Sequence, residues 1–241
     1  MGKKSGSKAL KRNMAPTFWV IKRKEKRFVT KPSPGPHSSK LSIPIVVLLR
    51  DVLNLTNTYS ETKIVIRDGG VIVDGCVRKD CDYSVGLMDV VEVPKLNLIY
   101  RLVPSKRLIE PIKISKSEKN IKLCKILGKK SLSKDVFQYS LHDGRNINLT
   151  SNDANVGSTM KIEIPSQKVK KILDLKTNNL VVLIGGQNKG KIGKITNISP
   201  SSFSRPKMLE IDVNDTKIEV QSKFALVIGE NQSELNLIGE L

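Results

Sequence analysis

Apolar residues at spacings of three and four mark the first regular element of the chain. In SIPIVVLLRDVLNL, residues 42–55, this spacing runs from Ile45 to Leu53 and predicts a helix with one buried face. Ser42 is a suitable N-cap, and Pro44 is acceptable in the first turn because its missing N–H is not needed there. We therefore expect the first helix to begin just after Ser42.

A second, shorter helix is expected directly afterwards. Thr58 and Glu61 have the spacing of a capping box, in which each side chain accepts a hydrogen bond from the backbone N–H of the other residue. Gly69 and Gly70 can take positive φ where this helix ends.

The remainder of the chain alternates in the manner of β-strands. VIVDGCVR predicts a hairpin, because Asp74 and Gly75 tolerate the left-handed conformations of a tight turn. Further along, NLIYRLV, IKISK, FQYSLHDGRNINL and TMKIEI are separated by turns such as HDGR and PSQ, which predicts a second sheet or small barrel. LVVLI and the β-branched residues after GGQNKGKIG predict two strands joined by a Gly turn. However, Ile192, Ile195 and Ile198 are three apart, which is not the alternation of a regular strand.

These patterns predict an α+β, β-rich protein of four parts. The parts are a basic N-terminal extension at 1–40, a two-helix plus hairpin module at 41–93, a central β-rich domain at 94–176 and a C-terminal small β-barrel at 177–241. A length of 241 residues allows one to three small domains that each bury a core.

Positive charge dominates the composition and is concentrated at one end. The chain has 42 Lys and Arg against 23 Asp and Glu, a formal charge of +19, which calls for a polyanionic partner. Twelve of these basic residues lie within residues 1–40, where Glu25 is the single acid. Such a run is often only a solvated tail. Here it is interleaved with Phe18, Trp19 and Phe28, which favours an extension that becomes ordered on nucleic acid.

Several chemical functions find little support. Cys76, Cys81 and Cys124 are too few for a disulfide framework, and with His37 and His142 they give no four-ligand zinc spacing. We expect a reducing compartment, no metal, no cofactor and no small-molecule substrate. Cys76 and Cys81 are expected to pack against neighbours. The adjacent His142 and Asp143 favour a structural bond over acid–base catalysis.

The distribution of apolar residues predicts neither a membrane span nor an export signal. The first apolar run begins at Ile43 and is broken at Arg50, whereas a bilayer span takes about 20 apolar residues. Prolines at four positions between Pro16 and Pro36 would interrupt the helix of a mitochondrial presequence. We expect no membrane partner.

GGQNKGKIG, residues 185–193, raises the question of a nucleotide site. Gly185, Gly190 and Lys191 fit the fixed places of a phosphate-binding loop, but Ile192 stands where a Ser or Thr must ligate magnesium. The following residues are also rich in β-branched side chains and Gly, rather than suited to the helix that such a loop opens. We expect the turn to contact RNA backbone instead.

Motifs along most of the chain resemble one family. The two helices, Gly turn and hairpin resemble the RNA-binding module of bacterial small-subunit ribosomal protein four, and the strand–Gly turn–strand resembles a KOW barrel. More specifically, the chain resembles the e-type small-subunit ribosomal protein four family of archaea and eukaryotes, in an archaeal-type form because it ends soon after FALVIGE. The segments that carry this resemblance are LKR at 10–12, AP at 15–16 with Trp19, PSPGPH at 32–37, GLMDV at 86–90, KLCKI at 122–126, HDGRNI at 142–147 and IGGQNKGKIGKITN at 184–197.

The resemblance implies a structural constituent of the cytoplasmic small ribosomal subunit that binds small-subunit ribosomal RNA, in its 5′ domain, beside neighbouring ribosomal proteins. Basic side chains would displace counterions from phosphates, and Trp19 and His37 could stack on RNA or bond to it. The candidate RNA-binding residues are Lys3, Lys4, Lys8, Lys11, Arg12, Trp19, Lys22, Arg23, Lys24, Lys26, Arg27, Lys31, His37, Lys40, Lys63, Arg67, Arg78, Lys79, Lys189, Lys191 and Lys194.

Two other classes remain open on sequence alone. A pseudouridine-synthase-like enzyme could carry the first module, but its catalytic Asp belongs in a GRLD-like context, and the nearest string here is GRNI at 144–147. A free transcription factor could carry a KOW turn, but it would not need the Lys-rich extension.

Overall fold

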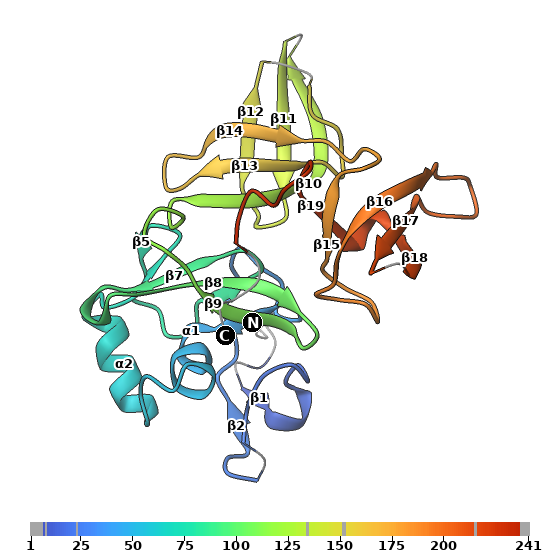
Figure 1. Ribbon diagram of the computed structural model, residues 1–241. Coiled ribbons are helices and arrows are strands. Elements are labelled where there is room, and N and C mark those ends of the chain that lie inside the picture. The colour runs from blue at the N-terminus through green and yellow to red at the C-terminus, as the bar shows by residue number, and fades with distance from the viewer. Residues whose placement is uncertain are drawn as a thin grey trace, which may run out of the picture.

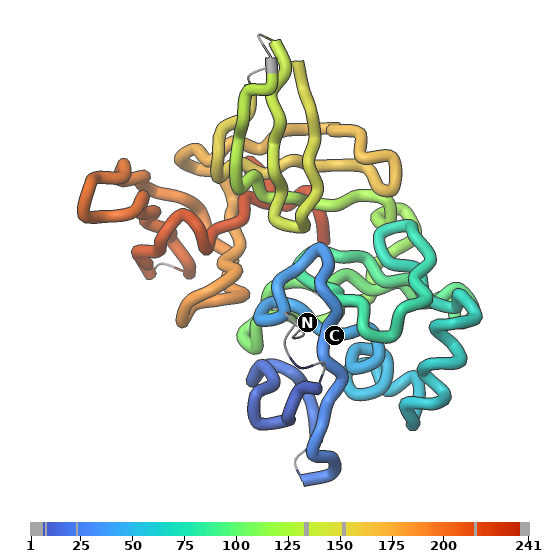
Figure 2. Tube along the Cα trace, turned by 180° about the vertical axis from the view of Figure 1, so that it is seen from behind, coloured from blue at the N-terminus to red at the C-terminus, as the bar shows by residue number. Residues whose placement is uncertain are grey.

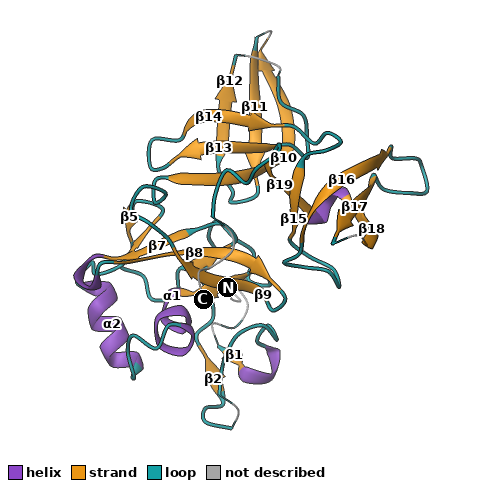
Figure 3. Ribbon diagram, viewed as in Figure 1, coloured by secondary structure: helices purple, strands orange, loops and turns teal. Residues whose placement is uncertain are grey.

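Three five-stranded antiparallel sheets dominate the computed structural model, which describes residues 7, 9–22, 24–133, 135–150, 153–214 and 216–236. Helices are few: the two α-helices lie beside the first sheet, and a short 3-10 turn lies in the C-terminal unit (Figures 1 and 3). The β-rich α+β prediction is therefore confirmed. None of the helices within these described ranges is long and apolar enough to cross a membrane.

The first unit combines the helices with a sheet of order β5-β4-β7-β8-β9. Its helical elements are α1 (Ile45–Val47), the π-helical turn η2 (Leu48–Val52), α2 (Tyr59–Arg67) and the 3-10 turn η3 (Pro94–Leu96). Its strands are β4 (Ile72–Val73), β5 (Cys76–Val77), β7 (Val90–Val93), β8 (Leu98–Ser105) and β9 (Leu108–Lys113), with β3 (Ser42–Pro44) paired to β6 (Ser84–Gly86). The extension adds β1 (Leu10–Lys11), the 3-10 turn η1 (Arg12–Met14) and β2 (Phe28–Val29).

The other two units each contain one sheet. The central sheet, of order β12-β11-β10-β13-β14, consists of β10 (Ile121–Ser133), β11 (Val136–Leu141), β12 (Asn146–Leu149), β13 (Thr159–Glu163) and β14 (Lys168–Leu173). The C-terminal sheet, of order β18-β17-β16-β15-β19, consists of β15 (Leu180–Leu183), β16 (Ile192–Ser199), β17 (Met208–Val213), β18 (Thr216–Gln221) and β19 (Ala225–Gly229), with the 3-10 turn η4 (Ser222–Phe224).

Each unit has its own apolar core, and two of these cores include residues from a neighbouring unit. The core of the C-terminal sheet also takes in Met88 and Val103 from the first unit and Leu123 from β10. The central core includes Val90 and Ile99 of the first sheet. The units therefore pack against one another through apolar contacts.

The start of the first helix differs from the prediction. Ser42 is not an N-cap: its backbone pairs with Gly86 in the β3–β6 ladder, and its hydroxyl donates to the Ser38 carbonyl at 2.9 Å. Pro44 remains extended at ψ 144°, so the helix begins only at Ile45. The helix is then buried all round from Ile45 to Leu49 rather than on one face, because β3 and the first sheet enclose it.

Predictions based on local turn chemistry are largely confirmed. The Glu61 N–H donates to Thr58 Oγ1 at 3.2 Å, and the Thr58 N–H donates to Glu61 Oε2 at 3.3 Å, which completes the capping box of α2. Gly69 takes φ +74°, and Asp74 and Gly75 take φ of 50° and 75° in the β4–β5 turn. Gly70 has no positive φ.

The first sheet extends beyond the boundary expected after residue 93. Strand β8 pairs with β7, and β9 pairs with β8 at the edge of this sheet, so a break after residue 93 would divide it. Alternation predicted these strands but could not show which neighbour they pair with, because pairing is a non-local property.

A bulge accounts for the spacing of three between Ile195 and Ile198 in β16. The register against β17 shifts between Ile195 and Asn197, so one extra residue is accommodated there. Ile195 is fully buried, and Ile198 returns to the apolar side one residue later than a regular strand would place it. The segment is a strand, as predicted.

Candidate nucleic-acid interface

The extension is held in a defined conformation by its own basic residues. Strands β1 and β2 close it into a hairpin. The Arg12 guanidinium donates from Nη2 to the Ile21 carbonyl at 2.7 Å and from Nε to the Lys22 carbonyl at 2.9 Å. Lys31 Nζ donates to the Ser7 carbonyl at 2.6 Å. Arg12 and Lys31 thus stabilise the hairpin itself as well as adding charge.

Other cations of the extension gather on its surface. A hollow of about 810 Å³ lies at the hairpin, and its lining includes the exposed side chains of Lys11, Lys24, Lys26 and Arg27. The single acid of this stretch, Glu25, is 3.3 Å from Lys22. Lys3, Lys4, Lys8 and Arg23 lie outside the described residues.

Trp19 is a structural residue, contrary to the expectation that it could stack on RNA. Its side chain is 5% exposed and packs in the core of the first unit. Its indole N–H donates to the Ser42 carbonyl at 2.9 Å, next to the start of the first helix. The tryptophan therefore attaches the extension to the first unit, and RNA has no access to its ring.

His37 is likewise buried, so its expected RNA contact is also wrong. After the β1–β2 hairpin the chain runs along the side of the first unit (Figure 2). His37 Nε2 lies 3.0 Å from both carboxylate oxygens of Asp89 and donates to them. A Cβ on Gly86 would lie 2.3 Å from the imidazole Cγ, so the residue below the ring must be glycine.

The predicted basic patch of the first unit is mixed in charge. Arg67 on α2 and Lys79 after β5 are exposed, whereas Lys63 and Arg78 are half-buried. The guanidinium of Arg78 lies 4.5 Å from the centre of the Tyr83 ring. The carboxylates of Asp80 and Asp82 lie among these cations. The pKa of Asp82 is raised by burial and, to a smaller extent, by the negative charge of Asp80. The patch is a weaker attractor of polyanions than the extension.

The Gly-rich loop between β15 and β16 is a hairpin turn and not a nucleotide cradle. It is followed by strand β16, whereas a phosphate-binding loop opens a helix. Gly185 is needed because a Cβ there would lie 2.6 Å from the Phe224 ring, and Gly186 takes φ +83°. Lys191 and Lys194 are exposed, and Lys189 is half-buried.

A network of charged side chains is buried where the first unit meets the central sheet. Lys122 Nζ lies 2.6 Å from Asp74 Oδ2, 2.5 Å from Asp89 Oδ1 and 3.1 Å from Asp143 Oδ2. Arg145 Nη2 lies 2.8 Å from Asp74 Oδ2 and adds a second cation. Burial works to raise the pKa of Asp89, but the charges and hydrogen bonds of Lys122 and His37 together lower that pKa well below the usual range. The network therefore holds the units together through ionised groups.

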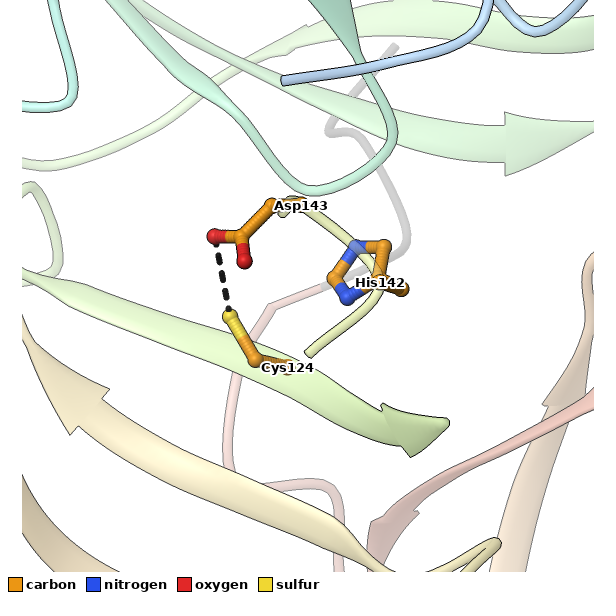
Figure 4. A group of neighbouring side chains, drawn as sticks. All are labelled: Cys124, His142 and Asp143. Atoms are coloured by element: carbon orange, nitrogen blue, oxygen red, sulfur yellow. Dashed lines mark hydrogen bonds between the residues drawn. The ribbon is translucent and has the colours of Figure 1, made fainter. Parts of the chain in front are cut away.

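Cys124, His142 and Asp143 lie together beside this network (Figure 4). The Cys124 thiol donates to Asp143 Oδ2 at 3.5 Å, and burial raises the thiol pKa well above its ordinary value. His142 Nδ1 accepts from the Lys125 N–H at 3.2 Å, and Nε2 donates to the Leu87 carbonyl at 3.2 Å. Burial lowers the pKa of His142 to about 4, so the ring is neutral.

These contacts leave no free ligand set for a metal and no activated nucleophile. Both nitrogens of His142 are occupied by backbone groups, and Asp143 Oδ2 already faces Lys122 Nζ at 3.1 Å and Arg145 Nη1 at 3.5 Å, which would repel a metal ion. His142 and Asp143 are structural, as predicted, but they bond to other partners rather than to each other. Cys81 is buried as expected, whereas Cys76 is exposed and does not pack as expected.

Some buried charged residues connect the units, although neither charge nor motifs in the sequence indicated them. Lys125 Nζ, 4% exposed as a residue, donates to the carbonyls of Ser222, Lys223 and Ala225 and so connects β10 to the C-terminal unit. Sequence offers no signal for such burial, because a lysine in a basic protein is expected at the surface.

Small antiparallel sheets carrying exposed cations define a basic, β-rich binding protein. Within the ranges that the structure describes, the three residues most like a catalytic group, Cys124, His142 and Asp143, are engaged in structural bonds. Comparison with known proteins then gives the family.

The sequence matches Ribosomal family S4e over residues 96–169 and the RS4NT (NUC023) domain over residues 4–40. Small ribosomal subunit protein eS4 of Metallosphaera sedula is 38% identical over 92% of this chain and 96% of that protein. The protein of the same name from Methanosphaera stadtmanae is 32% identical over 100% of both chains. The chain belongs to ribosomal family S4e, which confirms the resemblance and its archaeal-type form.

A solved structure shares the fold. The crystal structure of the 30S ribosomal protein S4e from Thermoplasma acidophilum matches with a TM-score of 0.70 at 23% identity, covering 79% of this chain and 96% of that chain. The relatives described here are named as ribosomal proteins, and none is named as an RNA-modifying enzyme or a transcription factor.

Proposed function

We propose that this protein is a structural constituent of the cytoplasmic small ribosomal subunit, where it binds and stabilises small-subunit ribosomal RNA next to other ribosomal proteins. The names of its relatives support this role. The observation that carries it is the group of exposed cations on the β1–β2 hairpin, opposed by one carboxylate that already pairs with Lys22.

The finer parts of this proposal concern modules and residues. We infer that α1, α2 and the β4–β5 hairpin act as an RNA-binding module, that β15–β19 form a KOW-type barrel, and that the RNA contacted is the 5′ domain. The proposed contacts within the described residues are Lys11, Lys22, Lys24, Lys26, Arg27, Lys40, Lys63, Arg67, Arg78, Lys79, Lys189, Lys191 and Lys194, with Arg12 and Lys31 contributing charge. Lys3, Lys4, Lys8 and Arg23 remain proposed contacts from sequence.

Affinity in this proposal comes from the release of condensed counterions. Each neutralised phosphate lowers the logarithm of the binding constant by roughly 0.7 to 0.9 for every tenfold rise in salt. At ~0.15 M salt this amounts to about fourfold to fivefold in affinity per contact.

The test is incorporation into subunits. A variant with Lys11, Lys24, Lys26 and Arg27 changed to Gln would be mixed with archaeal small-subunit RNA and the remaining subunit proteins, then sedimented. We expect affinity to fall by about 250-fold to 600-fold, seen as lost occupancy at limiting protein, because four phosphate contacts are removed. The matched control changes four other exposed lysines to Gln: Lys113, Lys116, Lys130 and Lys217. Equal occupancy of both variants would refute the role assigned to the hairpin.

A further inference from the structure

A second basic groove forms where three segments that are distant in sequence meet. Its volume is about 330 Å³. One wall comes from the extension, another from the tip of the β8–β9 hairpin, and a third from the Gly-rich loop after β15. The lining residues are Met14, Pro16, Thr17, Phe18, Lys40, Arg107, Leu108 and Lys189.

Gly190 allows two of these segments to touch. A Cβ at this position would lie 2.7 Å from the Cα of Ser105 and 3.0 Å from the backbone nitrogen of Lys106, so only glycine lets the loop rest on the hairpin tip. Its φ is +83°, and its N–H donates to the Leu183 carbonyl at 2.7 Å, which closes the loop. This contact brings Lys189 to the groove that Arg107 also lines.

The groove is cationic and contains no counter-charge of its own. Lys40, Arg107 and Lys189 line it together, no carboxylate lines it, and none of the three makes an ion pair with the residues that the structure describes. Like charges gathered in this way repel each other unless an anion binds between them. Met14, which is 75% exposed, and Leu108 provide an apolar wall beside the charges.

We propose that this groove binds one strand of RNA, with backbone phosphates against Lys40, Arg107 and Lys189 and a base or ribose against Met14 and Leu108. The combination of cations and apolar surface suits an unpaired segment, because single-stranded RNA presents both phosphates and unstacked bases. The inference rests on the proposed function and adds Arg107, which sequence reasoning did not select. It also gives the Gly-rich loop a specific place in the interface.

The first experiment removes the charges. The full chain with Lys40, Arg107 and Lys189 changed to Gln would be titrated with a labelled transcript of archaeal small-subunit ribosomal RNA at several salt concentrations. We expect affinity to fall on the order of 100-fold at ~0.15 M salt, and the salt slope to fall by about 2 to 3 in magnitude. The control changes Lys116, Lys130 and Lys217 to Gln, and we expect a loss below about threefold. Equal losses in the two variants would overturn the groove as a site.

The second experiment leaves every charge in place. Gly190→Ala adds a methyl group that collides with the hairpin backbone, so we expect the loop to move away and RNA affinity to fall by about tenfold. Gly186→Ala is the matched control, because Gly186 has the same φ of +83° but nothing within 4 Å of its added Cβ. If both variants bind RNA equally well, the loop contact does not build the site. Circular dichroism would establish that each variant folds, and if Gly190→Ala does not fold, the charge variant decides.

Failure of this inference can be told from failure of the proposed function. If the unmodified protein does not bind the RNA, the proposed function fails and the groove with it. If it binds with a steep salt slope while the Lys40, Arg107 and Lys189 variant is unchanged, only the groove is refuted. If that variant binds RNA normally but no longer enters subunits, the occupant is a protein, and the assignment to RNA is overturned.

Discussion

Replacing Lys122 by Met tests whether the buried charge network holds the units together. The ammonium group is fully buried and contacts the carboxylates of Asp74, Asp89 and Asp143 within 3.1 Å. Met keeps much of the side-chain volume and removes the charge together with the hydrogen bonds that the ammonium group donates to Asp74 and Asp89. The carboxylates would stay buried, and Arg145 would be the remaining lysine or arginine side chain in contact with them.

The pKa of Asp143, one of the three carboxylates, gives the size of the expected loss in stability. Burial works to raise the pKa of Asp143, but its neighbours, of which Lys122 contributes most, together lower it from 3.8 to about 2. This difference corresponds to about 2.5 kcal/mol of folding stability at neutral pH. Breaking a buried ion pair by removing one partner typically costs about 3 to 5 kcal/mol. We therefore expect Lys122→Met to lower the free energy of unfolding by about 4 kcal/mol at pH 7.

The pH dependence of this loss has a definite sign. A carboxyl with a lowered folded pKa contributes stability above its unfolded pKa, and that stability is lost as the pH falls through the folded value. The native protein should thus lose the Asp143 contribution between about pH 4 and pH 2. Without Lys122, burial favours the protonated acids, so the deficit of the variant should shrink as the pH falls from 7 toward 4.

Urea denaturation followed by the fluorescence of Trp19, the single tryptophan of the chain, would measure the loss. Lys119→Met is the control, because Lys119 Nζ is 3.4 Å from Glu92 in a half-buried pair at the surface that is worth about 1 kcal/mol or less. A Lys122 variant as stable as the Lys119 variant would refute the reasoning.

Three further predictions concern single residues. Trp19→Phe removes the buried hydrogen bond to the Ser42 carbonyl and should cost about 1 to 2 kcal/mol by thermal unfolding, while the RNA affinity of the folded variant stays unchanged; a loss of affinity would restore an RNA role for Trp19. Thr58→Ala removes the N-cap of α2 and should cost about 1 kcal/mol, whereas Thr58→Ser should be nearly neutral. NMR titration of His142 should give a pKa near 4; because this is below the unfolded value, its contribution to stability is lost as the pH falls from about 6.5 to 4, and a midpoint above 6 would contradict the buried neutral ring.

Local signals in the sequence predicted local structure well. The capping box of Thr58 and Glu61 and the Asp74–Gly75 turn depend on a few neighbouring residues, and the structure contains both. The first helix began two residues later than Ser42 and Pro44 suggested, because a ladder to a distant strand took those residues. The sequence pattern alone does not show whether Ser42 and Pro44 join a helix or pair with a distant strand.

The candidate RNA-binding residues show the same difference between local and non-local features. Exposed cations such as Lys24 and Lys26 follow from charge density alone. Trp19 and His37 lie in the same basic stretch, yet their partners are more than 20 positions away, at Ser42 and Asp89. The spacing of residues along the chain does not predict that Trp19 and His37 are buried. It also does not predict that the β8–β9 hairpin tip contacts the Gly-rich loop.

The salt dependence of RNA binding tests most directly the claim that surface cations hold ribosomal RNA by neutralising its phosphates. The full chain would be titrated with archaeal small-subunit ribosomal RNA across a range of salt concentrations. With about ten phosphates neutralised, the logarithm of the binding constant should fall against the logarithm of salt with a slope of roughly 7 to 9 in magnitude. A nearly flat line would contradict the claim.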